Sequence, residues 1–358
     1  MTVFFVSNSQ FREYGFVKMH LSRFAKNSYK MMKVITLNGF GTTDNFELKE
    51  LEMPKMQSDE VLISIEASAF NPIDYQMRSG QREKALMMGS IMGIEFSGVI
   101  VDLGKDVVGF QVGDEVMSCS ILRGSNGTYA EYISLPYQEL VLKPKNINFA
   151  AAASLPVAAL TAKACLTRMN CKNDDHLFIN GASGGVGRLL ISLLKYHDFK
   201  NIVVTAGNPN SVAVLKGLGV TEENIIDYHE QGLEEKILRM NNGNLYDHVV
   251  DLVGGPISEV TAQILRVNGN YVDVTFHGTK LTHEILFDKA ATILNIAEYA
   301  NIYLNQQLRP LASIVSEGKI TVPEVNVVGN FSVETVKEAH RLMESNLTFG
   351  RKLVMINR

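Results

Sequence analysis

The sequence predicts an α/β protein in which a β-rich part precedes a doubly wound parallel sheet of the Rossmann type. Residues 32–145 contain many short apolar runs separated by glycine turns, which is typical of a compact barrel-like unit. After about residue 150, strand-like and helix-like segments alternate, as they do in βαβ units. Residues 177–190 place a glycine-dense turn between a short apolar run and an apolar helical segment, and the second part is organised around this turn.

The composition sets limits on partners and compartment. A chain of 358 residues is long enough for two domains, and its 46% hydrophobic and 20% charged residues are ordinary for a globular protein. The net charge of −4 offers no basic surface to nucleic acid. Three cysteines are too few for a disulfide framework, so a reducing, cytoplasmic compartment is the default. We expect no membrane span, because no apolar run reaches roughly 18 residues.

Residues 1–31 differ in composition from the rest of the chain. They contain five basic residues against the single acid Glu13, together with several serines and asparagines. This composition resembles an organellar transit peptide, and the alternative is an upstream start codon before a fold that begins at Met31 or Met32. We expect the upstream start, treat residues 1–31 as an extension outside the fold, and keep organellar targeting as the alternative.

The β-rich part is predicted to contain at least four strands. Residues 61–67 alternate between apolar and polar side chains, as a half-buried strand does. Residues 96–101 and 115–119 are short apolar runs between glycine-containing turns, and residues 124–133 indicate a turn that enters a strand.

The second part begins with an alanine-rich, helix-prone segment at 149–166, in which Pro156 marks a break or a first turn. The apolar pattern then predicts strands and helices in alternation: strands at 177–180, 202–205, 225–226, 248–251 and 271–275, and helices at 185–196 and 209–218. Beyond residue 299 it predicts a helix over 302–317, a strand at 325–328, a helix over 332–345 capped by Ser332, and a closing strand at 352–356.

The glycine turn has two interpretations. Ala182, Gly184 and Gly187 occupy the glycine positions of G-x-G-x-x-G, a dinucleotide loop whose backbone N–H groups approach a pyrophosphate at a helix N-terminus. Gly181, Ser183 and Gly185 also spell G-x-S-x-G, the nucleophile elbow of α/β-hydrolases. For a hydrolase, the remaining triad members would come from Asp251 or Asp273 with His277 or His283.

Several stretches share order and spacing with a known family: residues 71–80, 93–100, 109–116, 127–132, 155–162, 181–187, 339–345 and 350–354. Together they resemble the zinc-independent quinone oxidoreductase branch of the medium-chain dehydrogenase/reductase superfamily. The resemblance implies a GroES-like catalytic domain made of residues 32–151 and 299–358, wrapped around a Rossmann domain of residues 152–298. It also implies a cofactor between the two domains and, usually, a homodimer.

Zinc-dependent members of this superfamily carry a cysteine and a histidine where this chain has Asn71 and Ile94. No cysteine occurs near residues 155–157, where a third ligand would fall, and the four-cysteine structural lobe is missing. Asparagine and isoleucine are not zinc ligands, so the chain is predicted to be zinc-free. The eight histidines show no paired metal spacing and are interpreted as background.

The choice of cofactor depends on the end of the second strand of the parallel sheet. An NAD site presents Asp or Glu there, whereas this chain has Gly207, Asn208, Asn210 and Ser211. Without a carboxylate to repel a 2′-phosphate, NADP(H) is favoured, although several relatives have a lysine where Ser211 stands. The residues predicted to contact NADP(H) are Thr161, Ala182, Ser183, Gly184, Gly185, Val186, Gly187, Asn208, Ser211, Tyr228, Leu252, Val253, Thr275 and Lys352.

Asn71 and Tyr75 are the predicted catalytic residues, because the resemblance places them where the zinc site of other members faces the nicotinamide. Either could hydrogen-bond the substrate carbonyl and stabilise negative charge on its oxygen. The alternative for the segment from Asn71 to Asp74 is a turn and capping device, and Glu95 is interpreted as a buried structural carboxylate.

The resemblance implies hydride transfer from NADPH to quinones or α,β-unsaturated carbonyl compounds. Two alternatives stay open from the residues alone, namely a serine hydrolase that uses Ser183 and an NADPH-binding protein without turnover. Residues 81–90 and 298–307 are the least family-like, so we expect them to determine substrate specificity.

Overall fold

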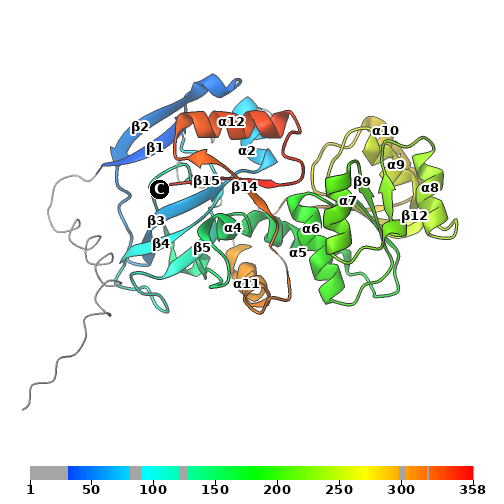
Figure 1. Cartoon of the computed structure of the whole chain (residues 1–358), viewed down its shortest axis with the longest axis horizontal. Coiled ribbons are helices and arrows are strands. Elements are labelled where there is room, and N and C mark those ends of the chain that lie inside the picture. Colours follow the sequence, from blue (N-terminus) through cyan, green and yellow to red (C-terminus); the bar gives the residue numbers. More distant parts are fainter. Residues whose placement is uncertain (1–30, 81–89, 121–126, 298–303, 321, 358) are drawn as a thin grey trace, which may run out of the picture.

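A computed structural model describes residues 31–80, 90–120, 127–297, 304–320 and 322–357. The specificity segments expected at 81–90 and 298–307 therefore fall largely outside the described residues, as does the extension before Met31. Two units lie side by side along the long axis of the molecule, one β-rich and one built on a parallel sheet (Figure 1).

The β-rich unit is built on a seven-stranded sheet whose strands come from distant parts of the chain. Its order is β14-β15-β3-β4-β5-β7, with β6 paired to β3. The bounds are β3 Glu60–Ala69, β4 Glu95–Leu103, β5 Glu115–Cys119, β6 Tyr132–Pro136, β7 Val141–Leu142, β14 Val325–Asn330 and β15 Lys352–Ile356. Because β15 pairs antiparallel with β3, the end of the chain is built into the same sheet as residues near its beginning.

Other elements close the β-rich unit. The hairpin of β1 and β2 adds a second, two-stranded sheet, while α2 and α12 pack on each other and on the unit's apolar core (Figure 1). The bounds are β1 Met31–Leu37, η1 Thr43–Asn45, β2 Phe46–Glu52, α2 Pro72–Ser79, η2 Tyr137–Glu139, α4 Phe149–Ala153 and α12 Val333–Glu344.

The second unit contains a six-stranded parallel sheet in the order β10-β9-β8-β11-β12-β13. This is the strand order of a dinucleotide-binding Rossmann fold, with the switch point between β8 and β11. The strand bounds are β8 Leu177–Asn180, β9 Ile202–Ala206, β10 Ile225–Asp227, β11 Tyr246–Asp251, β12 Leu265–Asp273 and β13 Thr292–Asn295.

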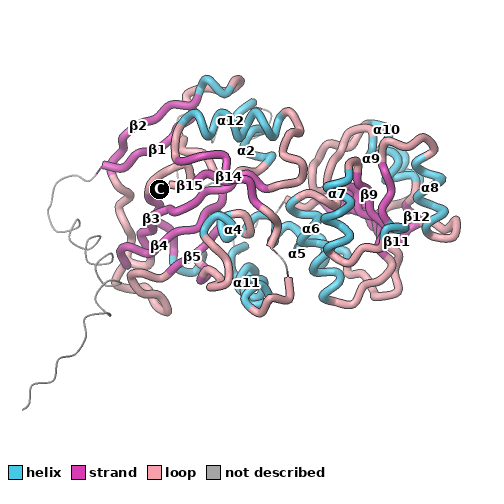
Figure 2. Tube along the Cα trace, in the orientation of Figure 1, coloured by secondary structure: helices cyan, strands magenta, loops and turns pink. Residues whose placement is uncertain are grey.

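Helices cover both faces of this parallel sheet (Figure 2). Leu177 and Ile179 of β8 pack with residues of α5, α6 and α7, whereas Phe178 packs on the opposite side with residues of α8, α9 and α10. Burial of both faces explains why the strands are short, almost purely apolar runs. The helix bounds are α5 Pro156–Met169, α6 Gly185–Tyr196, α7 Pro209–Gly217, η3 Glu222–Asn224, α8 Leu233–Met240, α9 Ile257–Gln263 and α10 Lys280–Asp288.

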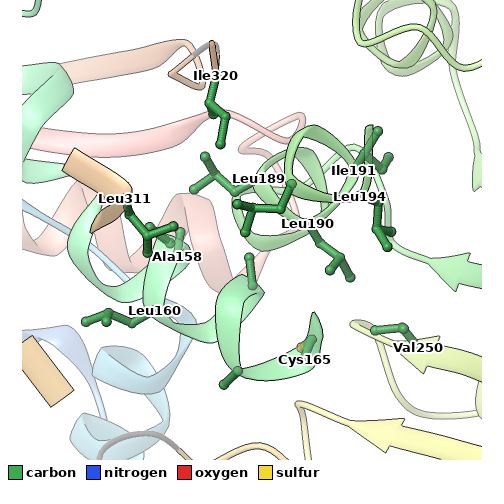
Figure 3. Packing of buried hydrophobic residues seen from close by; sticks show 14 of the residues in the cluster. Ala158, Leu160, Cys165, Leu189, Leu190, Ile191, Leu194, Val250, Leu311 and Ile320 are labelled. Atoms are coloured by element: carbon green, nitrogen blue, oxygen red, sulfur yellow. The ribbon is translucent and has the colours of Figure 1, made fainter. Parts of the chain in front are cut away.

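The two units share one apolar core. Met117 of β5 and Val141 of β7 belong to the same buried cluster as the residues of α5 and α6. The short segment η5 Leu304–Gln307 leads into α11 Leu308–Ser316, and α11 completes this cluster. Figure 3 shows Leu189 of α6 near Ala158 of α5 and Leu311 of α11. Shared packing of this kind fixes the β-rich unit against α5 and α6 of the second unit.

Several predicted boundaries agree with the structure, among them the strands at 115–119, 177–180 and 352–356 and the helix at 185–196. The strand predicted at 271–275 is misplaced, since β12 starts at Leu265 and ends at Asp273. The predicted helix at 149–166 is two helices, and the second begins at Pro156. No helix in the described part of the chain is long and apolar enough to cross a membrane.

Candidate active site

The glycine turn connects β8 to α6 and combines tight packing with open backbone. Gly181 has a φ of 75°, and a Cβ on Gly187 would lie 2.5 Å from the carbonyl oxygen of Ala182. In contrast, a Cβ on Gly184 or Gly185 would meet nothing closer than 3.4 Å. The turn is therefore tightly packed at Gly181 and Gly187, whereas there is open space beside the backbone of Gly184 and Gly185. Pyrophosphate binding at a helix N-terminus requires such accessible backbone.

Ser183 is held in this turn through its backbone. The buried Arg188 donates from Nε to the Ser183 carbonyl oxygen at 2.6 Å, and a Cβ on Gly350 would lie 2.7 Å from that oxygen. The carboxylates suggested for a hydrolase triad have other partners, since Asp251 binds Tyr271 and Asp273 binds backbone N–H groups. The structure gives no support to the serine hydrolase interpretation.

A row of buried polar side chains crosses the carboxyl ends of β9, β8, β11 and β12. Thr205 donates to Asn180 at 3.0 Å, Asn180 donates to Asp251 at 3.3 Å, and Tyr271 donates to Asp251 at 2.8 Å. Burial raises the pKa of the Tyr271 hydroxyl, which keeps it a donor. This row fixes the edge of the sheet at which a dinucleotide binds in this fold.

Asp251 and Asp273 each hold the loop that follows their own strand. Asp251 accepts from the backbone N–H of Val253 at 3.0 Å, which places Leu252 and Val253 against Gly181. Asp273 accepts from the N–H of Thr275 at 3.0 Å in the same way. The predicted residues Leu252, Val253 and Thr275 therefore lie on two loops that start from the same edge as the glycine turn.

The expected adenosine end is formed at the carboxyl ends of β9 and β10. Asn208 caps α7 by accepting from the Ser211 N–H at 2.9 Å. The Tyr228 ring covers Gly207 so closely that a Cβ there would lie 2.4 Å from it. Lys216, in the last turn of α7, pairs with Glu222 at 2.7 Å. Asn208, Ser211 and Tyr228, predicted from separate stretches, are thus brought together.

Three predicted or discussed residues form a buried polar centre in the β-rich unit. Glu95 is fully buried, and its carboxylate accepts from the Asn71 side-chain amide at 2.8 Å and from the backbone N–H of Val157 at 2.9 Å. Lys352 lies 2.6 Å from the same carboxylate, and its ammonium also donates to the Asn71 side-chain oxygen. We refer to Asn71, Glu95 and Lys352 as the polar triad.

The polar triad adjoins the glycine turn. The aliphatic part of Lys352 lies 3.9 Å from the position of a Cβ on Gly185, and Val157 belongs to the first turn of α5. The side chain of Lys352 is only 9% exposed, so its charge depends on Glu95 for compensation. Glu95 is structural, as interpreted from the sequence, but it also fixes two predicted site residues.

Tyr75 and Thr161 are less clearly arranged for chemistry. Tyr75 is half-buried on α2 and packs against the core of the β-rich unit. The Thr161 hydroxyl donates to the carbonyl oxygen of Val157 at 2.8 Å, within α5. Thr161 therefore retains only its acceptor capacity for a ligand.

Asp74 supports the start of α2 beneath the polar triad. Its carboxylate accepts from the Asn71 N–H at 2.7 Å, which is the turn and capping role foreseen for this segment. Burial raises the pKa of Asp74 to about 7 despite that hydrogen bond, and the charge of Glu95 adds to the rise. Nearby, burial lowers the pKa of His340 to about 3.

We predict that Asp74→Asn stabilises the protein at high pH relative to the wild type. The folded-state pKa of Asp74 is raised from 3.8, so the stability it contributes is present below about pH 4 and is lost as pH rises through 7. The advantage of the variant should grow by up to about 1.4 kcal/mol per pH unit over that window. The titration of His340 changes the free energy of unfolding of both proteins equally, so it does not affect the difference between them.

Urea unfolding at pH 5 and pH 8 measures this difference. Asp288→Asn, at the exposed end of α10, is the matched control and should show no such trend. A gap between Asp74→Asn and wild type that does not change with pH would contradict the assignment.

The sequence missed a contact between the two units. Gln76 of α2 and His277 of the loop after β12 meet with their side-chain nitrogens 3.2 Å apart. From the sequence, His277 was considered only as a possible hydrolase triad member and otherwise as background, although it follows the predicted residue Thr275 by two positions. In the described part of the chain no cluster of three or more His, Cys, Asp or Glu side chains is arranged to hold a metal ion.

Comparison with known proteins places this geometry in a family. Residues 57–145 match the alcohol dehydrogenase GroES-like domain, and residues 219–354 match the zinc-binding dehydrogenase family. A chloroplastic quinone-oxidoreductase homolog of Spinacia oleracea is 33% identical over 69% of this chain and 75% of its own length. A chloroplastic NADPH-dependent alkenal/one oxidoreductase of Arabidopsis thaliana is 28% identical over 91% of this chain and 80% of its own length.

A solved structure agrees with these relatives. The quinone oxidoreductase from Coxiella burnetii superposes with a TM-score of 0.76 at 30% identity, covering 92% of this chain and all of that chain. The Coxiella protein and the two sequence relatives are all named as oxidoreductases. The chain belongs to the quinone oxidoreductase branch of the medium-chain dehydrogenase/reductase superfamily.

Proposed function

We propose that this protein is an NADPH-dependent oxidoreductase that reduces quinones or α,β-unsaturated carbonyl compounds. The observation that carries the proposal is the position of the polar triad beside the open glycine turn, with Lys352 reaching Gly185. The names of the Spinacia and Arabidopsis relatives support the same substrate classes.

The residues at the carboxyl edge fit NADP(H). The turn from Ala182 to Gly187 would hold the pyrophosphate through backbone N–H groups, with Ser183 and Val186 in backbone roles. Asn208, Ser211 and Tyr228 would surround the 2′-phosphate at a strand end without a carboxylate. Leu252, Val253, Thr275 and Thr161 would line the nicotinamide side. When bound, the nicotinamide supplies hydride.

Within the polar triad, Asn71 is the group we propose to meet the substrate oxygen. Glu95 takes one of its two amide hydrogens, so the second remains available to a carbonyl oxygen. The Lys352 ammonium beside it adds positive potential where negative charge develops on that oxygen. Tyr75, half-buried on the same helix, is the second candidate donor.

We propose that the reaction needs no zinc. Asn71 and Ile94 stand where zinc-dependent relatives supply ligands, and neither side chain binds zinc well. The Lys352 ammonium also lies 2.6 Å from the buried Glu95 carboxylate, so a divalent cation bound there would have to displace it. The donor set therefore does not fit a zinc ion.

An oxidation assay tests the proposal. We expect menadione and methyl vinyl ketone to accelerate oxidation of NADPH more than of NADH, with activity unchanged by EDTA. Equal use of both nucleotides would contradict the role of Asn208 and Ser211. NADPH binding without oxidation across such acceptors would favour a binding protein, and fluorophosphonate labelling that Ser183→Ala abolishes would revive the hydrolase.

We also propose a domain division, a homodimer and a cytoplasmic location. The catalytic domain would comprise residues 32–151 and 299–358, and the Rossmann domain residues 152–298. A homodimer would form through β13, an edge strand on which Ile293 is 41% exposed, and light scattering would test it. We propose a cytoplasmic location because the few cysteines favour a reducing compartment. Cell fractionation of the full chain would distinguish this location from organellar targeting by residues 1–31.

A further inference from the structure

His277, in the loop after β12, contacts α2 of the β-rich unit. Its Nε2 lies 3.2 Å from the side-chain nitrogen of Gln76, which is 92% buried in α2 five residues after Asn71. The contact joins residues 201 positions apart. His277 itself is exposed, so water reaches the ring.

The loop that carries His277 is held in a defined conformation. Asp273 accepts from the N–H groups of Thr275 and Phe276 at 3.0 and 2.8 Å, and Phe276 has a φ of 56°. The His277 carbonyl oxygen accepts from the Gly255 N–H at 2.8 Å, which ties this loop to the one after β11. A non-glycine residue at positive φ is uncommon and persists only where surrounding contacts hold it. These hydrogen bonds therefore fix the conformation of the loop.

The polar triad offers no equivalent proton source. Lys352 is engaged with Glu95 and Asn71 in a buried pair, and losing its proton would leave Glu95 uncompensated. An exposed imidazole can exchange its proton with water and is the side chain best suited to acid–base work near neutral pH. Gln76 can meet either protonation state, donating through its nitrogen or accepting through its oxygen.

We propose that His277 is a catalytic residue that protonates the oxygen of the reduced acceptor, with Gln76 as its positioning residue. This inference rests on the proposed function, which supplies the hydride. It assigns to the reaction a proton donor from the nucleotide-binding unit, held by Gln76 of α2, the helix that begins after Asn71.

The step balances in atoms and charge. As hydride forms a C–H bond at the β-carbon of an enone, the electron pair of the C=C bond moves through the conjugated system onto the carbonyl oxygen. The Nδ1–H bond of the imidazolium breaks as an O–H bond forms, while Nε2 stays beside Gln76, which leaves a neutral enol and a neutral imidazole. Water then returns a proton to His277, and the enol rearranges to the saturated ketone.

Other titratable and charged groups surround His277 and shape the test. Strand β12, which precedes its loop, ends at Asp273, and the neighbouring strand β11 ends at Asp251. Helix α9 contributes Glu259, which accepts from Thr279. Helix α10 contributes Lys280 and His283, and α2 carries Asp74, Tyr75 and Arg78. Because burial raises the pKa of Asp74 to about 7, only the part of a pH profile that disappears with His277 can be assigned to it.

The test compares His277→Gln with His283→Gln, an identical change at an exposed histidine of α10. We expect His277→Gln to lower kcat with methyl vinyl ketone by about 100-fold, within the range of general acid catalysis. Its effect with menadione should be smaller, because that quinone is a stronger hydride acceptor. NADPH affinity, measured by fluorescence titration, should be unchanged, and His283→Gln should resemble the wild type.

The pH profile adds a readout that a merely structural role would not move. The fall of kcat at high pH should vanish in His277→Gln, and Gln76→Glu should move that fall to higher pH, since a nearby carboxylate favours the imidazolium. Unchanged kcat and pH dependence in His277→Gln would overturn the proposal. A parallel loss of NADPH affinity would also overturn it, by assigning His277 to loop structure.

A measurement without turnover separates this inference from the proposed function. The imidazole resonance of His277, identified by its loss in His277→Gln, should shift when butanone is added to the protein with NADP⁺. If the wild type oxidises no NADPH with either acceptor, the proposed function fails first. In that case the imidazole resonance still tests His277 by itself. If butanone causes no shift of this resonance, the proposed contact between His277 and the acceptor oxygen is wrong.

Discussion

Glu95→Gln is expected to destabilise the protein by about 3–5 kcal/mol, the usual effect of removing one partner of a buried ion pair. Glu95 is fully buried and the Lys352 side chain is 9% exposed, so the variant leaves an ammonium without a counter-charge away from water. Glutamine can still accept from Val157 or Asn71, and the loss is therefore mainly electrostatic. Urea unfolding at neutral pH measures it.

A second substitution tests this reason. Glu95→Gln combined with Lys352→Met removes both charges and should recover most of the lost stability, because an apolar side chain fills the space without needing compensation. The exposed pair of Asp44 and Lys337 provides the control, since Asp44→Asn should cost less than about 1 kcal/mol. A double variant as unstable as Glu95→Gln would show that the charge of Lys352 is not the cause.

The recovery of stability should not restore activity. Lys352→Met removes the ammonium that donates to Asn71, so the double variant would fold while its triad lacks the charge proposed to stabilise the substrate oxygen. In this variant, stability towards urea should therefore recover while NADPH oxidation stays low. This result would distinguish the structural role of Glu95 from the proposed catalytic role of its partners.

Local patterns predicted the parts of this fold that local forces determine. The boundaries of β8 and α6 follow from an apolar run, a glycine turn and an amphipathic segment that are adjacent in the sequence. The cap at Ser332 was predicted for the same reason, and its side chain accepts from the Thr335 N–H at 3.1 Å. Misplacement of β12 arose because Arg266 to Asn270 include polar residues and a glycine, which do not indicate a strand.

Long-range pairing limited the prediction of the site. Lys352 was expected to approach a cofactor phosphate, and nothing near it in the sequence indicates a salt bridge with Glu95, far away on β4. His277 was set aside because histidine spacing alone suggested no ligand set. Its contact with Gln76 depends on how the two units pack, and that packing is produced by the shared apolar core of α5, α6 and α11.

Gly187→Ala is expected to destabilise the protein by about 3 kcal/mol or more, at or beyond the upper end of ordinary overpacking. The added Cβ would lie 2.5 to 2.7 Å from three backbone atoms of Ala182, and backbone cannot move aside as a flexible side chain can. Relief would require β8 and α6 to separate, although both are buried in the core that the two units share. Thermal and urea unfolding measure the effect.

Two other glycines make this prediction specific to position. Gly217→Ala, at the end of α7 with nothing within 4 Å of the new Cβ, should leave stability unchanged or raise it by up to about 1 kcal/mol. Gly185→Ala should also fold normally, since its Cβ meets nothing closer than 3.9 Å, yet it should bind NADPH more weakly because it covers backbone that the pyrophosphate must approach. A stable Gly187→Ala would refute the packing argument, and a Gly185→Ala that binds NADPH like the wild type would refute the assignment of the turn.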